Sequence, residues 1–338
     1  MHPSTILIRA TNWVGDAVMC LPALRAIRER FPEAHIAILA KPWVADLYAR
    51  ESFTDELILY TARTRRDKLA FAYSLRARRF DCAILLQNAF EAALLAWIAG
   101  IPHRIGYHRD GRGLFLTRAA RRPKPGEIPS HQRFYYLELL RRTGLIASLP
   151  ESDAIRLDGP KIQRTHTVGV SPGAAYGTAK RWLPERFAEA AATLATERNA
   201  SIALFGSKDE RALCEQVAAL LPNFAVTNYA GQTTLSQFID LAAACEVFLT
   251  NDSGAMHVAS ALAVPTVAVF GSTDDTTTGP TGPLARVVRE HAECSPCLLR
   301  ECPIDHRCMT RVTADRVATV ALELWEESAP AWTQEARS

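Results

Sequence analysis

The sequence predicts an α/β protein built from two doubly wound parallel sheets, and three observations lead to this fold class. Apolar strand-like runs alternate with helical patterns along most of the chain, as in strand–helix–strand units. A polar segment at residues 148–165, with Pro, Gly and little periodicity, interrupts the alternation. At 338 residues and 48% hydrophobic composition, the chain is long enough to form two cores.

The first half is predicted to form one parallel sheet, and an N-terminal domain is expected over residues 1–155. The helix expected at 17–31 is amphipathic, because apolar residues recur on one face of it. Those residues are Leu21, Leu24, Ile27 and Phe31. The expected strands are 5–10, 35–40, 56–60, 81–87 and 104–107.

A second series of strands and helices begins after the polar segment, which is interpreted as a linker. It defines a C-terminal domain at 165–312, followed by a helix at about 314–328. The expected strands are 167–171, 201–205, 225–229, 247–250 and 266–270. Two sheets of this kind leave a cleft between the carboxyl ends of their strands, where ligands usually bind.

Composition and termini favour a cytoplasmic protein. The longest apolar region, 82–99, is interrupted by Gln87, Asn88 and Glu91, so it does not resemble a membrane span. The N-terminus has a strand-like pattern in place of a charged start with an apolar signal core.

Positive charge is concentrated in the first half of the chain. Residues 61–79 and 103–124 each hold seven Arg or Lys against one Asp, so these stretches carry +12 while the remainder carries −9. One interpretation is a solvated helix surface; the other is contact with an anionic partner such as phosphorylated lipid headgroups. No nucleic-acid partner is expected, because the aromatic residues of a stacking platform are missing.

The segment 250–257 (TNDSGAMH) predicts an anion site. It lies between a strand-like run and a helix-like run, and a tight polar turn in that position presents backbone N–H groups and a positive helix end to a phosphate.

Three other loops that follow predicted strands carry candidate residues. Asp16 comes after the first strand, where a carboxylate is often only a helix N-cap. The loop 171–182 (SPGAAYGTAKRW) brings Gly residues and two cations to a helix start, which suits a diphosphate bound without metal. Glu210 is placed to hold ribose hydroxyls or, alternatively, to match a helix dipole.

The motifs together resemble a known family, the lipopolysaccharide heptosyltransferases of glycosyltransferase family 9, and most closely the heptosyltransferase II type. The matching segments occur in order between residues 5 and 310: 13–16 (WVGD), 172–173 with 177–182, 205–207 (FGS), 230–233 (AGQT) and 251–257. The resemblance implies a GT-B fold with an acceptor-binding N-terminal domain and an ADP-heptose-binding C-terminal domain. It also implies that the final helix returns to pack on the first domain.

The resemblance further implies the reaction and the residues that perform it. The expected reaction transfers L-glycero-D-manno-heptose from ADP-heptose onto heptosyl-Kdo2-lipid A, with Asp16 as general base and Lys180 stabilising the leaving ADP. The implied donor-binding residues are Tyr176, Gly177, Thr178, Lys180, Glu210, Thr233, Asp252, Ser253, Gly254 and His257. A structural role for His257, packed on its helix, stays open. The implied acceptor loop contains Asn12, Trp13 and Gly15.

The implied partners are ADP-heptose, a phosphorylated lipid A-core acceptor and the cytoplasmic face of the inner membrane, contacted peripherally. One departure from the family pattern is Ala174-Ala175, where some relatives carry an acid or a hydroxyl residue. No obligatory metal is expected, because Lys180 can neutralise phosphate, and Asp274-Asp275 is not interpreted as a metal pair.

The cysteines pose a separate question. Four of them, Cys20, Cys82, Cys214 and Cys245, are scattered in helix or strand patterns and are expected to be buried. The other four, Cys294, Cys297, Cys302 and Cys308, are clustered. A structural metal or cluster, disulfides and free thiols all remain open for the clustered four.

Two further function classes stay open from the sequence. A related transferase would use another acceptor, through first-heptose transfer or transfer to another glycan or a protein. A nucleotide-binding or metal-sensing module would lack transferase activity, although a pure binder has no need for both Asp16 and Lys180. A redox dehydrogenase is disfavoured, because no Gly-x-Gly-x-x-Gly turn follows a strand.

Overall fold

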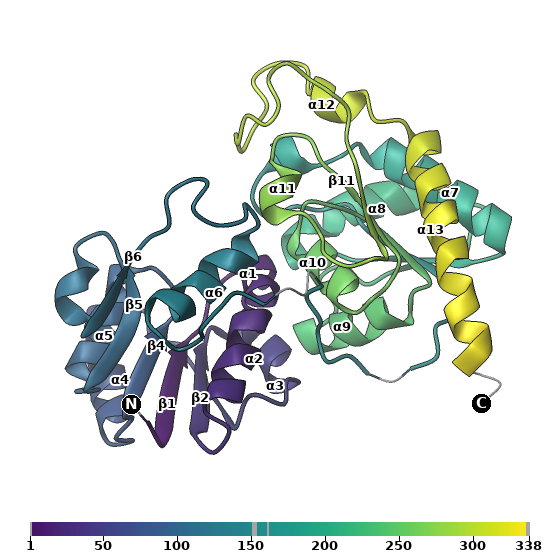
Figure 1. Ribbon diagram of the computed structural model, residues 1–338. Helices are drawn as coiled ribbons and strands as arrows, with labels where there is room; N and C mark the ends of the chain where they lie inside the picture. The colour runs from purple at the N-terminus through teal and green to yellow at the C-terminus, as the bar shows by residue number, and fades with distance from the viewer. Residues whose placement is uncertain (1, 151–153, 161, 336–338) are drawn as a thin grey trace. The chain divides into compact units, whose positions relative to one another are not determined.

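The computed structural model (Figure 1) describes residues 2–150, 154–160 and 162–335, with side chains to Ser328. The chain divides into two compact units, Met1–Ser152 and Asp153–Ser338. The sequence placed the domains at 1–155 and 165–312. Each unit contains one six-stranded, fully parallel sheet.

The sheet of unit 1 has the strand order β3-β2-β1-β4-β5-β6. At its centre Ile8 lies opposite Ile38 on one side and Ile84 on the other, and all three are fully buried. From β1 the chain continues to β2 on one side of the sheet, and from β4 it continues to β5 on the other side. The point where the strand order reverses, called the switch point, therefore falls at the carboxyl ends of β1 and β4. The strands are β1 (Thr5–Arg9), β2 (His35–Ala40), β3 (Glu56–Leu59), β4 (Cys82–Leu85), β5 (His103–His108) and β6 (Arg118–Arg121).

The helix predicted at 17–31 is two helices, separated at Cys20. Pro22 lies in the first turn of the second helix and has no N–H to continue the hydrogen-bond ladder of the first, so the chain starts a new helix there. The helices of unit 1 are α1 (Val14–Met19), α2 (Leu21–Arg30), α3 (Pro42–Ala49), α4 (Arg65–Arg76), α5 (Phe90–Ile98), η1 (Arg112–Phe115) and α6 (Gln132–Arg142).

The sheet of unit 2 repeats this topology, with the order β12-β11-β10-β7-β8-β9. Leu249 at its centre lies opposite Val170 and Val267, again with all three buried. The switch point of unit 2 therefore falls at the carboxyl ends of β7 and β10. The strands are β7 (Thr167–Ser171), β8 (Ser201–Leu204), β9 (Val226–Asn228), β10 (Val247–Asn251), β11 (Thr266–Val269) and β12 (Ala285–Val288).

Two strands were missed by the sequence analysis, β6 and β12, and both lie at sheet edges. The β6 sequence is RAAR, with only Ala120 buried, and β12 is the short ARVV. An edge strand needs little apolar surface, because it is covered on fewer sides than a central strand, so hydrophobic pattern alone does not reveal it.

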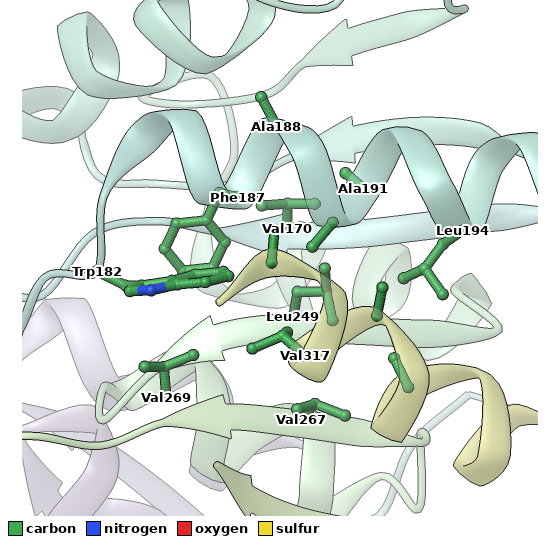
Figure 2. Close-up of a cluster of buried hydrophobic side chains, with 14 of the residues drawn as sticks. Val170, Trp182, Phe187, Ala188, Ala191, Leu194, Leu249, Val267, Val269 and Val317 are labelled. Atoms are coloured by element: carbon green, nitrogen blue, oxygen red, sulfur yellow. The ribbon is translucent and has the colours of Figure 1, made fainter. Parts of the chain in front are cut away.

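The final helix was expected to pack back on the first domain. Within unit 2, α13 (Ala314–Glu335) packs on α7 (Pro184–Arg198) and the sheet, where Val317, Ala321 and Leu324 join the hydrophobic core. Figure 2 shows Val317 beside Leu249 and Val267, with Trp182 and Phe187 close by. The apolar face of α13 is thus used within its own unit.

The remaining helices of unit 2 are short or lie on the outside of the sheet. They are η2 (Thr178–Lys180), η3 (Lys208–Glu210), α8 (Arg211–Ala219), α9 (Leu235–Ala244), α10 (Gly254–Ala261), α11 (Asp275–Thr278) and α12 (Arg307–Thr310). None of the helices in the described parts of the chain combines the length and the apolar character that a membrane span needs.

Residues 154–160 of the predicted linker are attached to unit 2. The Ile155 and Leu157 side chains are buried, and their backbone N–H groups donate to Thr281 Oγ1 and the Ala261 carbonyl oxygen, at 2.9 and 3.0 Å. The linker prediction was therefore too long at this end, because two apolar residues in a polar context suffice to anchor a segment. Residues 151–153 and 161 lie outside the described residues.

Candidate active site

Asp16 lies in the first turn of α1, directly after the carboxyl end of β1. The N-cap of this helix is Trp13, which makes no side-chain capping bond, so the interpretation of Asp16 as the cap is wrong. The Asp16 carboxylate accepts a hydrogen bond from the Tyr136 hydroxyl at 2.9 Å, with Tyr136 supplied by α6. Chain segments 120 residues apart therefore meet at this carboxylate.

Burial gives Asp16 the character of a base. Desolvation raises the pKa of the Asp16 carboxyl, while the hydrogen bond from Tyr136 lowers it. The pKa of Tyr136 itself is well above its ordinary value, because the ring is buried and faces Asp16, so its hydroxyl remains a proton donor at neutral pH. A partly desolvated carboxylate that is held by one neutral donor is suited to accept a proton from a substrate hydroxyl.

The predicted acceptor loop is only partly exposed. Trp13 is 64% exposed, whereas Asn12 and Gly15 are half-buried. Asn12 is fixed on both sides, since its Oδ1 accepts from Arg9 Nη2 at 3.1 Å and its carbonyl oxygen accepts from Trp43 Nε1 at 2.7 Å. Hydrogen bonds through Asn12 therefore hold this loop in place, and the Trp13 side chain is exposed on it.

A cavity of about 400 Å³ opens in unit 1 at the carboxyl ends of β1 and β4. Asn12 is the one predicted site residue on its wall. The sequence analysis noticed the basic stretches but missed the cavity, because its residues come from four separate segments. The lining residues are Arg9, Asn12, Lys41, Tyr60, Ala62, Arg63, Lys68, Gln87, Ala89, Glu91, Ala92 and Leu95.

The cavity carries an excess of positive charge. Arg9 is buried, and desolvation lowers its pKa to about 10, so it remains a cation at neutral pH. Burial, together with the neighbouring Arg9, also lowers the pKa of Lys41, whose Nζ lies 4.3 Å from the Tyr60 ring centroid. Arg63 and Lys68 add two further cations, whereas Glu91, which is paired with Lys68, is the one lining carboxylate. An anionic group is the ligand that this charge favours.

In unit 2, Lys180 and Asp252 form a shielded ion pair at the switch point. Lys180 Nζ lies 2.5 Å from Asp252 Oδ2, and their side chains are 13% and 5% exposed. Thr273 Oγ1 donates to the same carboxylate oxygen at 2.7 Å. Lys180 follows β7 and Asp252 follows β10, so the two central strands bring together residues from two motifs distant in sequence.

Asn251 braces the β7–α7 loop, residues 171–182, against β10, and sequence analysis gave it no role. Its Oδ1 accepts from the Trp182 N–H at 2.9 Å, and its Nδ2 donates to the Pro172 carbonyl oxygen at 2.7 Å. Asn251 is fully buried. The one available signal was an amide at the end of an apolar strand, where a polar side chain needs a specific partner.

Two glycines of this loop lie close to other segments, and at Gly177 the neighbour is backbone, which cannot move aside easily. A Cβ at Gly173 would lie 2.2 Å from Glu210 Oε1, and one at Gly177 would lie 2.2 Å from the Arg300 carbonyl oxygen. Glu210 Oε2 accepts from the N–H and the hydroxyl of Ser207, at 2.8 and 2.9 Å, in a capping box. Glu210 is thus an acid at a helix start, as one of the two interpretations predicted, and its Oε1 lies beside the β7–α7 loop.

The start of α10 has the geometry expected of an anion site. Ser253 is its N-cap and uses no side-chain capping bond, Gly254 is its first residue, and both are half-buried. His257 is one turn further on and is buried, as its structural alternative requires. Thr233 is half-buried in the turn before α9, and Thr178, which is exposed, begins η2.

The clustered cysteines lie in residues 294–308, here called the Cys-rich segment. All eight cysteines of the chain are free thiols in the structure. Burial raises the pKa of Cys308, and the neighbouring Cys294, Cys297 and Cys302 raise it further. Among the described residues, no group of three or more His, Cys, Asp or Glu has the arrangement of a metal site.

The acidic pair Asp274-Asp275 is engaged within the protein. Asp274 caps α11 through the Thr276 N–H at 3.0 Å, and Asp275 pairs with Arg289. Both carboxylates therefore have structural roles.

Comparison with known proteins agrees with this picture. A family model described as glycosyltransferase family 9 (heptosyltransferase) matches residues 68–307. Lipopolysaccharide heptosyltransferase 2 of Escherichia coli K12 is 34% identical over 308 residues, covering 84% of this chain and 87% of that protein. Lipooligosaccharide heptosyltransferase 2 of Campylobacter jejuni serotype O:2 is 29% identical over 334 residues, covering 96% and 99%.

A solved structure extends the comparison to the fold. The structure of E. coli ADP-heptose LPS heptosyltransferase II matches with a TM-score of 0.80 at 29% identity, covering 96% of this chain and 99% of that one. Two Rossmann-like units with residues for an anionic ligand at their strand ends define the class, a glycosyltransferase of GT-B fold. The chain belongs to glycosyltransferase family 9, the heptosyltransferases.

Proposed function

We propose that this protein transfers L-glycero-D-manno-heptose from ADP-heptose onto heptosyl-Kdo2-lipid A, with inversion at the anomeric carbon. The observation that carries the proposal is the Lys180–Asp252 pair at the switch point of unit 2, beside the start of α10. The names of the relatives, which are heptosyltransferases 2 from several bacteria, support the choice of sugar and acceptor.

The donor's diphosphate is bound by Lys180 and the α10 N-terminus. An ammonium group has three N–H donors, of which one serves Asp252, so two remain for phosphate oxygens. The backbone N–H groups at the helix start, around the Ser253 N-cap and Gly254, add partial positive charge. Asp252 and His257 face the sugar, Glu210 Oε1 serves the ribose, and the backbone around Thr233 lies along the adenine.

Asp16 acts as the general base. It takes the proton from the acceptor hydroxyl while that oxygen forms a bond to the anomeric carbon and the bond from this carbon to the phosphate oxygen breaks. The electron pair of the broken bond leaves with ADP, whose charge Lys180 stabilises. Tyr136 keeps the Asp16 carboxylate oriented, so that its free oxygen faces the hydroxyl.

The cation-rich cavity of unit 1 binds an anionic group of the acceptor. Arg9, Lys41, Arg63 and Lys68 surround it with one carboxylate between them, and a phosphorylated, Kdo-containing core offers both phosphate and carboxylate groups. Cationic walls of this kind favour the acceptor over neutral glycans.

A surface of α4 contacts the cytoplasmic face of the inner membrane. Leu69 and Tyr73 are 45% and 54% exposed on this helix and are flanked by Arg65 and Arg66. Exposed apolar side chains among cations suit an anionic headgroup layer. Flotation with anionic and neutral vesicles tests this: binding to the anionic vesicles alone, lost in Leu69→Glu, is expected, and equal binding of that variant contradicts the contact.

No metal is required for transfer, because Lys180 provides the positive charge that a divalent cation provides in other enzymes. Chelation with EDTA is expected to leave ADP release unchanged. Metal analysis of the purified protein is expected to find less than about a tenth of an equivalent of zinc or iron. If about one equivalent of metal is found, the metal would be assigned to Cys294, Cys297, Cys302 and Cys308, and these four residues would not be free thiols.

The test of the function is ADP release with ADP-heptose as donor and two acceptors, Kdo2-lipid A with and without its first heptose. Turnover only on the heptosylated acceptor is expected. Turnover only on the acceptor without heptose assigns the protein to the first transfer. If neither acceptor supports ADP release, other glycans and proteins become the acceptors to test.

A further inference from the structure

The Cys-rich segment is joined to the β7–α7 loop by three hydrogen bonds. The Ala179 N–H donates to the Arg300 carbonyl oxygen at 2.9 Å, and His306 Nε2 lies 3.0 Å from the Ala179 carbonyl oxygen. The Tyr176 hydroxyl donates to the Leu298 carbonyl oxygen at 3.0 Å. Both backbone groups of Ala179 are therefore held by a segment more than a hundred residues away in sequence.

His306 holds the residue that precedes Lys180. Since a carbonyl oxygen only accepts, the His306 ring must carry its proton on Nε2 to make this bond. Ala179 is buried, so its carbonyl has no ready replacement by water. The position of the Lys180 backbone thus depends on a side chain from outside the loop.

Arg300 brings a second cation to the same place. Its guanidinium carbon lies 5.1 Å from the centroid of the Tyr176 ring, and Lys180 Nζ lies 4.9 Å from that centroid. Within the described part of the chain, Lys180 is paired with Asp252, whereas Arg300 is exposed and has no carboxylate partner. Of the two cations beside the Tyr176 ring, Lys180 is already paired with a carboxylate. The charge of Arg300 therefore remains available to a negatively charged ligand.

The packing between the two segments is close. The Arg300 carbonyl oxygen occupies the space where any side chain at position 177 would begin. Gly177 therefore allows the Cys-rich segment to lie directly on the loop, and a larger residue there would push Arg300 away. The glycine at position 177 of the motif is therefore explained by its contact with a second segment of the chain.

We propose that the Cys-rich segment forms one wall of the donor site, in which Arg300 binds the diphosphate of a nucleoside diphosphate and His306 positions Lys180. The inference rests on the proposed donor role of Lys180 and extends it to residues that no motif of the sequence analysis contained. Arg300 is a binding residue, and His306 is a positioning residue, because it acts through Ala179.

The experiment measures ADP affinity by titration calorimetry and the Michaelis constant for ADP-heptose in the full-length protein. Arg300→Ala is expected to weaken ADP binding about fivefold and to reduce its salt dependence, while Arg300→Lys stays within about twofold of the parent. His306→Ala is expected to raise the donor's Michaelis constant about fivefold, and His306→Gln, whose amide still donates, restores it to within about twofold.

Arg307→Ala is the matched control. It removes the same charge from the same segment, but Arg307 pairs with Asp305 and Glu293 and has no ion pair or hydrogen bond to the loop among the described residues. It is expected to bind ADP like the parent. If Arg300→Ala and His306→Ala also match the parent while Lys180→Ala loses affinity, the wall is wrong and the donor site stands. If the parent protein itself fails to bind ADP, the proposed function fails, and this inference with it.

Discussion

The two units share one strand order but use their switch points differently. In unit 1 the strand ends carry an open, cation-rich cavity and a carboxylate that accepts a hydrogen bond from Tyr136. In unit 2 the same position holds an ion pair, a buried amide and glycines pressed against their neighbours. The repeated topology places loops at one edge of each sheet, whereas the loop residues decide the chemistry. An open basic cavity suits a large anionic acceptor, and a braced loop suits a nucleotide of fixed shape.

The largest effect is expected at Asp16. Asp16→Ala should reduce turnover by roughly two or more orders of magnitude, because the acceptor hydroxyl loses its base, and ADP affinity should stay nearly intact. Steady-state kinetics beside ADP titration checks this. A variant with near-normal turnover would remove the base role and reduce unit 1 to an acceptor-binding unit.

The Asp16→Asn variant tests whether a loss of turnover comes from loss of the base or from a folding defect. The folded-state pKa of Asp16 is raised, so the charged carboxylate costs stability that increases as pH rises through that pKa. The amide avoids this cost and can still accept from Tyr136. Its thermal midpoint at neutral pH is expected to equal or exceed that of the parent, with turnover still lost.

Lys180→Ala comes second in size. It should raise the donor's Michaelis constant and lower turnover by roughly one to two orders of magnitude, since binding and leaving-group charge are both affected. It also leaves the buried Asp252 carboxylate without its cation, with Thr273 still donating to it, so the unfolding temperature should fall. The Lys180→Ala, Asp252→Asn double variant should recover stability without activity. Unchanged donor kinetics in the single variant would contradict the phosphate assignment.

Lys41→Ala sharpens the contrast between the two units. It should raise the Michaelis constant for the acceptor about tenfold and leave that for ADP-heptose unchanged, because the cavity belongs to unit 1. Lys124→Ala, an exposed lysine of the same unit outside the cavity, is the matched control. Equal effects on both substrates would show that the cavity is not an acceptor site.

The smallest effect is expected for Tyr136→Phe, and it is seen best in the pH profile. The hydroxyl lowers the pKa of Asp16, so its removal lets that pKa rise further. The base is then protonated at a higher pH, and the acidic limb of the turnover profile should move upward, with turnover at its maximum reduced only a few-fold. An unmoved limb would mean that Asp16 does not control that limb.

Ten of the strands and the order of the motifs were predictable from the sequence, because central parallel strands are apolar runs that stand out against polar turns. The edge strands β6 and β12 were not, since their sequences carry too little apolar surface. The split at Cys20 was also missed. The local pattern indicated helix there correctly, but the point where the first helix ends depends on chain geometry.

The candidate site divides in the same way. Asp16, Lys180 and Asp252 were identified from motifs, yet the pairing of Lys180 with Asp252 joins residues 72 positions apart and is invisible to any local reading. Tyr136, Asn251 and Thr273 were missed because each carries its role only through a partner on another element. The same holds for Arg300 and His306, to which the sequence analysis assigned no role.

By itself the sequence determined that the chain forms two parallel α/β units with polar turns at their strand ends, because hydrophobic periodicity and turn chemistry act over a few residues. Tertiary structure alone decided which side chains are desolvated, which charges are already paired and which remain available. The physical reason is that burial and Coulomb interactions depend on distance in space. The raised pKa of Asp16 and the unpaired charge of Arg300 among the described residues are both consequences of such contacts.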